Sequence, residues 1–305
     1  MANTLKIGSS EHKQLFCRTF IDTHDPFKPA EIRWPDLDAE TLARLKAMPV
    51  WNEATRTEAA TAVKVQSLGD TEKDPLLAEA ISLQGFEEGR HAEVLQLLAR
   101  HYGIHVDDHP APEVPANPTR AFLRTGYGEC MDSFFAFGLF RMGERARYFP
   151  PSLVAIFETI MQEEARHIMF IVNWAAYLRA RRPALARPAF DVWRGWNIVA
   201  QALGRVKGAL AMTGGGKGEE KGGKTEAAAP DKSTAGFTMG AASFFSDFSL
   251  RAFLELCLAE NDRRLSPYDA RLLRPTMVPS VIRQVVKVLP RRGTPPTRSP
   301  EEKAA

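Results

Sequence analysis

The sequence has few cysteines and little net charge, and each shortage excludes a class of protein. Cys17, Cys130 and Cys257 lie far apart and form no Cys-x-x-Cys pair, so we expect neither a disulfide framework nor a zinc–thiolate site. The formal net charge of the 305 residues is only +3, and no nucleic-acid-binding motif is present, so we expect no nucleic-acid partner. The scattered thiols favour a reducing compartment, which predicts a cytoplasmic protein.

Long apolar runs are also missing. The opening stretch MANTLKIGSSEHKQLF contains no apolar segment of the kind found in secretory signals. The nearest approach to a membrane span, at 237–258, is interrupted by Asp247, Arg251 and Glu255. We therefore expect no transmembrane helix.

Four long helical patterns occupy the middle of the chain. Those at 50–69 and 73–101 are joined by a short turn, as are those at 117–148 and 151–182, while a long Pro-rich stretch connects the two pairs. Two helical pairs joined by one long crossover are the plan of a ferritin-like four-helix bundle. The sequence therefore predicts an all-α fold.

The segments around this bundle differ in composition. Apolar residues of the N-terminal segment, such as Phe16, Phe20, Phe27 and Trp34, need burial, so we expect an extended arm that packs on the bundle. A Gly-, Lys- and Glu-rich stretch without large apolar residues predicts a disordered linker. The expected organisation is an arm at 1–49 with one short helix near 38–47, the bundle at 50–182, an additional helix at 183–212, the linker at 213–236, C-terminal helices at 237–290 and a disordered tail at 291–305.

A five-letter motif occurs twice, as EEGRH in the second helical pattern and as EEARH in the fourth. Each copy contains Glu-x-x-His, formed by Glu88 with His91 and by Glu164 with His167. Residues three apart on a helix lie about 60° apart around the axis and about 5 Å along it, so each pair can bind one metal ion. Both pairs share their stripe with apolar residues, and a buried carboxylate without a partner is costly. A divalent cation would cancel that charge.

The other two helical patterns each offer one acid on their apolar face. Glu58 shares its face with apolar and small residues, whereas Glu53 lies on a polar face. Glu129 lies on an aromatic stripe, whereas Glu144 is off that stripe, near the helix end and beside several arginines. We therefore select Glu58 and Glu129 as inward acids. The predicted metal ligands are Glu58, Glu88, His91, Glu129, Glu164 and His167.

With four carboxylates and two imidazoles from four helices, the chain resembles the ferritin-like di-iron carboxylate superfamily. The resemblance covers roughly residues 50–182 and implies a site for two metal ions. Oxygen-rich donors with imidazole suit iron or manganese more than copper or zinc. Two iron ions are the expected cofactor, and the sequence does not distinguish Fe/Fe from Mn/Fe or Mn/Mn.

The remaining letters of the motif suggest support for the ligands. A metal-bound histidine usually donates its other ring N–H to a carboxylate, and we expect Glu87 and Glu163 each to serve the histidine of the opposite helix. Arg90 and Arg166 are expected to pair with these outer acids. The alternative is that all four form ordinary surface salt bridges. The whole E-E-x-R-H pattern is similar to the [D/E]ExRH motif of the acyl carrier protein desaturases and the bacterial multicomponent hydroxylases, although those hydroxylases favour Asp at the outer position.

The resemblance implies an O₂-dependent hydroxylase, N-oxygenase or desaturase. Such an enzyme would act on a small organic or acyl substrate and take electrons from a donor such as ferredoxin or a reductase. The aromatic helix around Glu129, with Gly126 and Gly128, predicts either a substrate pocket or ordinary core packing. A ferroxidase or peroxidase-type protein and a non-catalytic metal-binding interaction protein remain as alternatives.

The last helical pattern, at 279–289, has apolar residues on one side and Arg283 and Lys287 as positive charges. Docking on the chain's own core is the default expectation for such a helix. An acidic partner, such as an acyl carrier protein or ferredoxin, and a peripheral membrane surface are the other two options.

Overall fold

A computed structural model describes residues 5–213 and 249–290, with side chains described to residue 205 and again from 249. Within these ranges all regular structure is helical, as expected, and none of the helices has the length and hydropathy needed to span a bilayer. The elements are α1 (Ser10–Asp22), η1 (Pro29–Glu31), α2 (Ala39–Ala47), α3 (Trp51–Thr71), α4 (Pro75–Tyr102), α5 (Pro118–Arg145), α6 (Pro151–Arg181), η2 (Ala184–Ala186), α7 (Arg187–Thr213), α9 (Leu250–Leu265) and α10 (Met277–Val288).

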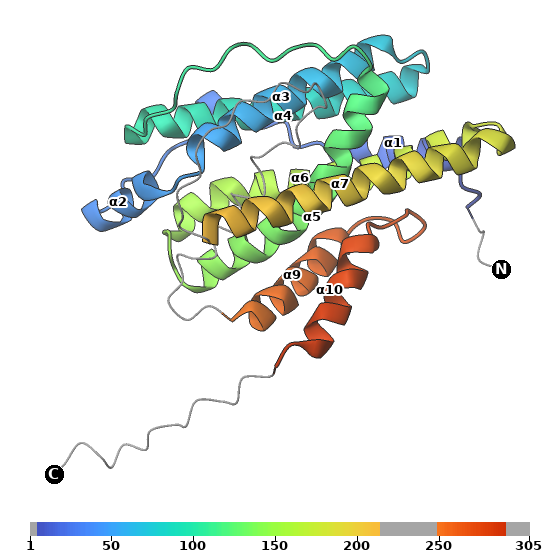
Figure 1. The fold of residues 1–305 in the computed structure, drawn as a ribbon. Helices are drawn as coiled ribbons and strands as arrows, with labels where there is room; N and C mark the ends of the chain where they lie inside the picture. The colour runs from blue at the N-terminus through green and yellow to red at the C-terminus, as the bar shows by residue number, and fades with distance from the viewer. Residues whose placement is uncertain (1–4, 214–248, 291–305) are drawn as a thin grey trace, which may run out of the picture.

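The four helices α3, α4, α5 and α6 form a bundle in which each contacts two others (Figure 1). Local sequence sets their ends. Asp74 caps α4 by accepting from the backbone N–H groups of Leu76 and Leu77, and Gly103, at φ 62°, ends the helix. Asn117 caps α5 in the same way, after the long crossover. The bounds of all four helices agree with the sequence patterns to within a few residues.

The N-terminal arm is more helical than the sequence suggested. The expected short helix is present as α2, but α1 was not predicted, and the expectation of an extended arm is wrong there. Ser9 caps α1 by accepting from the backbone N–H of His12. Phe16 and Phe20 are buried against α6, whereas Phe27 and Trp34 are only half-buried. The arm thus covers one side of α4 and α6 with a packed helix.

Three further helices surround the bundle. The predicted helix at 185–212 is α7, which runs along the outside of α5 and α6 (Figure 1). Helices α9 and α10 pack on α5, and Ile282 and Val286 of α10 are buried in one cluster with Phe134 of α5. The apolar side of α10 is therefore docked on the chain's own core. The predicted linker from residue 214 onward, the start of the C-terminal helices at 237–248 and the tail lie outside the described residues.

Two glycines of α5 allow close approach of neighbouring helices. A Cβ atom at Gly138 would lie 2.2 Å from Sγ of Cys257, so only glycine lets α9 sit this near. A Cβ atom at Gly126 would lie 2.3 Å from Cγ2 of Ile171 on α6. At Gly126, the expected alternatives of a substrate pocket or core packing are thus resolved in favour of packing, against Ile171.

Candidate metal centre

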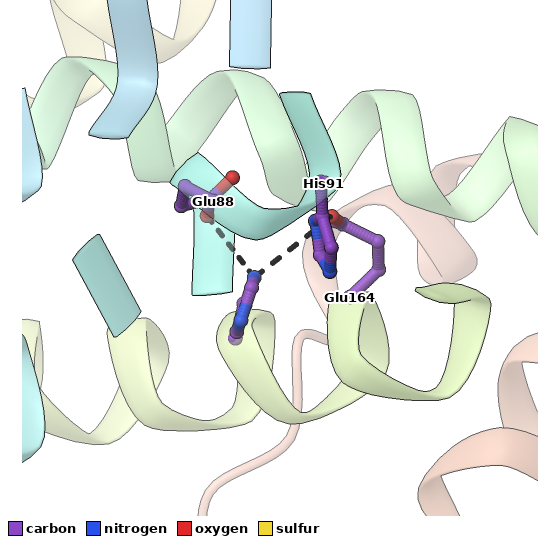
Figure 2. A group of neighbouring side chains, drawn as sticks. Glu88, His91 and Glu164 are labelled. Atoms are coloured by element: carbon purple, nitrogen blue, oxygen red, sulfur yellow. Dashed lines mark ion pairs between the residues drawn. The ribbon is translucent and has the colours of Figure 1, made fainter. Parts of the chain in front are cut away.

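Two glutamates and two histidines meet between α4 and α6. One ligand atom from each of Glu88, His91, Glu164 and His167 lies within 4.8 Å of the others. Nδ1 of His91 is 3.2 Å from Oε1 of Glu164, and Nδ1 of His167 is 3.0 Å from Oε1 of Glu88. Figure 2 shows Glu88 and His91 on α4 projecting toward Glu164 on the facing helix α6. Each histidine therefore faces the glutamate of the opposite helix.

The outer nitrogen of each histidine meets the outer acid of the opposite helix. Nε2 of His91 is 2.8 Å from Oε2 of Glu163, and Nε2 of His167 is 2.9 Å from Oε2 of Glu87. These are the cross-helix contacts expected from the doubled motif. If each Nε2 donates its proton outward, Nδ1 is left with a lone pair directed toward the cluster, which is the form that binds a metal ion.

The two motif arginines neutralise these outer acids. Arg90 donates to Oε1 of Glu163, and Arg166 donates to Oε1 of Glu87. Both guanidinium groups are buried, so these pairs are not the surface salt bridges considered as the alternative. Removing one partner of a buried ion pair leaves a charge without compensation, which is strongly unfavourable. These two buried ion pairs therefore hold the outer acids in place.

The N-terminal arm closes this outer side, which the sequence analysis did not foresee. His24, just after α1, contacts Oε1 of Glu87 through Nδ1. The rings of Phe20 and Phe27 lie 4.8 Å and 3.9 Å from the guanidinium carbons of Arg166 and Arg90, respectively. A lone histidine in a polar, Pro-rich stretch carries no local signal of such a role. Because two arginines already neutralise the outer acids, we do not regard His24 with Glu87 and Glu163 as a second metal site.

The two remaining predicted ligands lie on the other side of the cluster. Oε2 of Glu58, on α3, is 3.7 Å from Nδ1 of His91. Both carboxylate oxygens of Glu129, on α5, are buried and have no hydrogen-bond partner among the described residues. Burial, reinforced by the charges of Glu88 and Glu164, raises the pKa of Glu58 to about 8 and that of Glu129 well above its usual range. Neither group is stable as an anion here without a nearby cation.

The donor set fits a metal pair. Glu58, Glu88, Glu129 and Glu164 place four carboxyl groups around two imidazoles, and both Nδ1 atoms lack a hydrogen-bond partner. Burial alone would lower the pKa of each histidine, but the surrounding carboxylates raise it well above its usual value. The cluster thus attracts positive charge, and its oxygen and imidazole donors suit a divalent ion such as iron or manganese. The buried Glu/His cluster can therefore hold a metal ion.

A cavity of about 1230 Å³ reaches the cluster from the side of α3 and α5. Five of the six predicted ligands line it, and His167 is the exception. Its wall continues along apolar residues of α6. Gly128 also lines the cavity, unlike Gly126, but a Cβ atom there would lie 2.8 Å from Nη2 of Arg205. The apolar lining includes Trp51, Leu95, Phe140, Phe157, Ile160 and Met161.

Comparisons with protein-family models, with curated proteins and with solved structures found no match. The side chains and the fold therefore define the class: an all-α bundle with a buried Glu/His cluster that can bind a metal ion.

Proposed function

We propose that this chain is a ferritin-like di-metal oxidoreductase that uses O₂ to hydroxylate, N-oxygenate or desaturate a small organic or acyl substrate. The observation that carries the proposal is the coincidence of two features. Four Glu and His side chains of α4 and α6 form a cluster that can hold a metal ion, with Glu58 of α3 and Glu129 of α5 beside it. Five of these six side chains line a largely apolar cavity that is large enough for an organic molecule.

The residues divide into two half-sites. Glu58 with His91 would hold one ion and Glu129 with His167 the other, while Glu88 and Glu164, each in contact with the histidine of the opposite helix, would contribute to both half-sites. The proposed ions are two irons, with Mn/Fe or Mn/Mn as variants of the same donor set. A reduced di-iron pair, when bound, supplies O₂ activation and the oxidising power to attack an unactivated C–H bond.

The chain's own residues would hold the site and shape the substrate space. Glu87 and Glu163 would fix the orientation of the two imidazoles, and Arg166 and Arg90 pair with these acids. The apolar cavity walls exclude water and align an apolar substrate next to Glu129 and Glu164. The reaction also consumes electrons, which an external donor such as ferredoxin or a reductase would deliver.

Oxygen uptake by iron-loaded protein tests this function. We expect O₂ consumption that requires a reductant, accelerates with an apolar organic or acyl substrate and yields an oxidised product. The double variant Glu88→Ala/Glu164→Ala should consume no more O₂ than free iron. A matched variant, Glu79→Ala/Glu93→Ala, removes two exposed acids of α4 that do not line the cavity and should behave as the wild type.

The same assay separates the competing functions. A ferroxidase would consume O₂ with Fe(II) alone and accumulate ferric mineral, which would contradict the oxygenase proposal. A non-catalytic interaction protein would bind metal without stimulated O₂ uptake. The apolar cavity favours the oxygenase because iron entry and storage call for a polar path instead.

A further inference from the structure

Helix α7 carries its apolar stripe on the outside. Val192, Trp196, Val199 and Leu203 follow at spacings of four, three and four residues, so they share one face of the helix. All four are exposed, by 50% to 73%. A surface helix ordinarily turns such a stripe toward the core, and a contiguous exposed apolar face marks an interaction site.

The polar side chains of α7 explain this orientation, because they face the bundle. Nε of Arg179 on α6 donates to Asp191 at 2.7 Å, and Nε of Arg205 donates to Asp132 of α5 at 2.7 Å. Asn197 accepts from Arg124. These contacts hold α7 along its length with the apolar stripe turned outward. Phe190, Trp193 and Ile198 pack against the core as well, so α7 has apolar residues on both faces, and the exposed stripe is the outer one.

The flank of this stripe is positively charged. Exposed Arg120 lies with its guanidinium carbon 5.9 Å from the Trp193 ring, and exposed Arg124 donates to Asn197. Within the described part of the chain, neither arginine forms an ion pair with a carboxylate. Arg181, at the end of α6, adds a further exposed cation near the start of α7. The face therefore combines an apolar stripe, tryptophan and positive charge.

We propose that this face of α7 docks on the surface of an anionic lipid bilayer. Helices that lie in a membrane interface bury an apolar stripe and use flanking cations to attract acidic headgroups, and tryptophan prefers this depth. Symmetric pairing of two copies through the face is disfavoured, because it would bring two sets of unpaired arginines onto one interface. An anionic lipid surface complements both the apolar stripe and the charge.

The same face lies at the cavity that reaches the metal centre. Trp193 and Trp196 line this cavity together with Glu129 and Glu164. Docking of α7 would therefore place the part of the cavity lined by α7 next to the bilayer, from which a molecule with a long apolar chain could enter without crossing water. This assignment of substrate class, a lipid or acyl chain taken from the membrane, rests on the proposed function, whereas the docking itself does not.

Flotation of the full chain with vesicles tests the docking. We expect the protein to float with phosphatidylcholine vesicles that contain phosphatidylglycerol, and much less with phosphatidylcholine alone. Val192→Ser/Val199→Ser/Leu203→Ser removes three stripe residues that do not line the cavity, and should weaken partitioning by about tenfold or more. The matched control, Met277→Ser/Val281→Ser/Val288→Ser, changes three exposed apolar residues of α10 and should float as the wild type.

A second pair of variants tests the contribution of the positive charge beside the stripe. Arg120→Glu/Arg124→Glu should abolish the preference for phosphatidylglycerol, whereas Arg283→Glu/Lys287→Glu on α10 should retain it. Absence of flotation with either vesicle, or loss of it through the α10 variants alone, would overturn the proposal. A solution dimer that the α7 triple variant dissociates would also overturn it, by assigning the face to a second copy. The metal-deficient Glu88→Ala/Glu164→Ala protein should still float. Flotation therefore tests the docking even if the proposed function is wrong.

Discussion

Glutamates on the two sides of the Glu/His cluster have pKa values that are shifted in opposite directions. On the outer side, burial alone would raise the pKa of Glu87, but the hydrogen bond with His167 and the charges of His167 and Arg166 lower it to about 2. On the cavity side, neither Glu58 nor Glu129 has such a guanidinium partner in the part of the chain that the structure describes, and their pKa values rise. Glu87 stays ionised because the protein supplies the cations. The cavity-side acids need a cation from outside, which is what makes that side a binding site.

The largest effect should come from breaking the outer side. Glu87→Gln keeps the shape of the side chain but removes the carboxylate to which Arg166 donates, and leaves this buried arginine with only the longer contact of 3.6 Å to Glu163. We expect the free energy of unfolding to fall by roughly 3–5 kcal/mol, measured by urea denaturation of the metal-free protein. Glu93→Gln, at an exposed position of the same helix, should change it by less than about 0.5 kcal/mol. Equal, small effects of both changes on the free energy of unfolding would show that Glu87 does not form the buried ion pair with Arg166.

A substitution on the cavity side should instead raise the free energy of unfolding of the metal-free protein. Glu129→Leu replaces a buried carboxyl that has no hydrogen-bond partner with an apolar group of similar size. The metal-free protein should become more stable by about 1–3 kcal/mol, while its capacity falls from about two metal ions to about one. Denaturation and elemental analysis of the same samples measure the two effects. A destabilised variant that still bound both ions would refute the half-site assigned to Glu129.

The pH dependence of stability should also distinguish the two sides. The raised pKa values of Glu58, His91 and His167 mean that the folded, metal-free chain binds more protons than the unfolded chain near neutrality. Its stability should therefore fall as the pH rises from about 5 to about 8, by up to about 1.4 kcal/mol per pH unit for each proton involved. The lowered pKa of Glu87 acts in reverse, since its contribution is lost as the pH falls below about 4.5 toward about 2.

Denaturation midpoints across this pH range, with and without metal, provide the measurement. Bound metal replaces the protons on the cavity side, so the loss of stability toward pH 8 should disappear in loaded protein. A metal-free protein whose stability rises throughout this interval would contradict the description of the cavity-side acids.

The smallest effect should come from the arm. His24 is half-buried and contacts Glu87, which already has Arg166 and His167 as partners. His24→Ala should therefore cost only about 0.5–1.5 kcal/mol and leave the metal content unchanged. His105→Ala, at an exposed position in the crossover, provides the comparison, with no measurable effect on either quantity. Loss of metal on changing His24 would mean that the arm belongs to the binding side of the cluster.

The part of this arrangement that depends on helical periodicity could be predicted from the sequence. The spacing of Glu88 and His91, and its repeat in α6, predicted one face for each pair, and the same periodicity separated Glu58 from Glu53. The cross-helix contacts of Glu87 and Glu163 also followed from the repeat. Whether any of the six side chains binds metal stays a prediction.

Features set by packing between distant segments could not be read in this way. Helix α1 has apolar residues at helical spacing, but the surrounding prolines obscured the pattern and hid the position of His24. The space beside Gly126 depends on Ile171, which lies on another helix. The apolar stripe of α7 would ordinarily be assigned to the core, and only its ion pairs with α5 and α6 show that it faces outward.

Metal content per chain tests the central claim most directly. Protein loaded anaerobically with Fe(II) and desalted should contain about two ions per chain, by elemental analysis, in the wild type and in Glu79→Ala/Glu93→Ala. Glu88→Ala/Glu164→Ala should contain none while keeping its helical circular dichroism. Wild-type protein that retained no iron or manganese, or a double variant that retained both ions, would contradict the account.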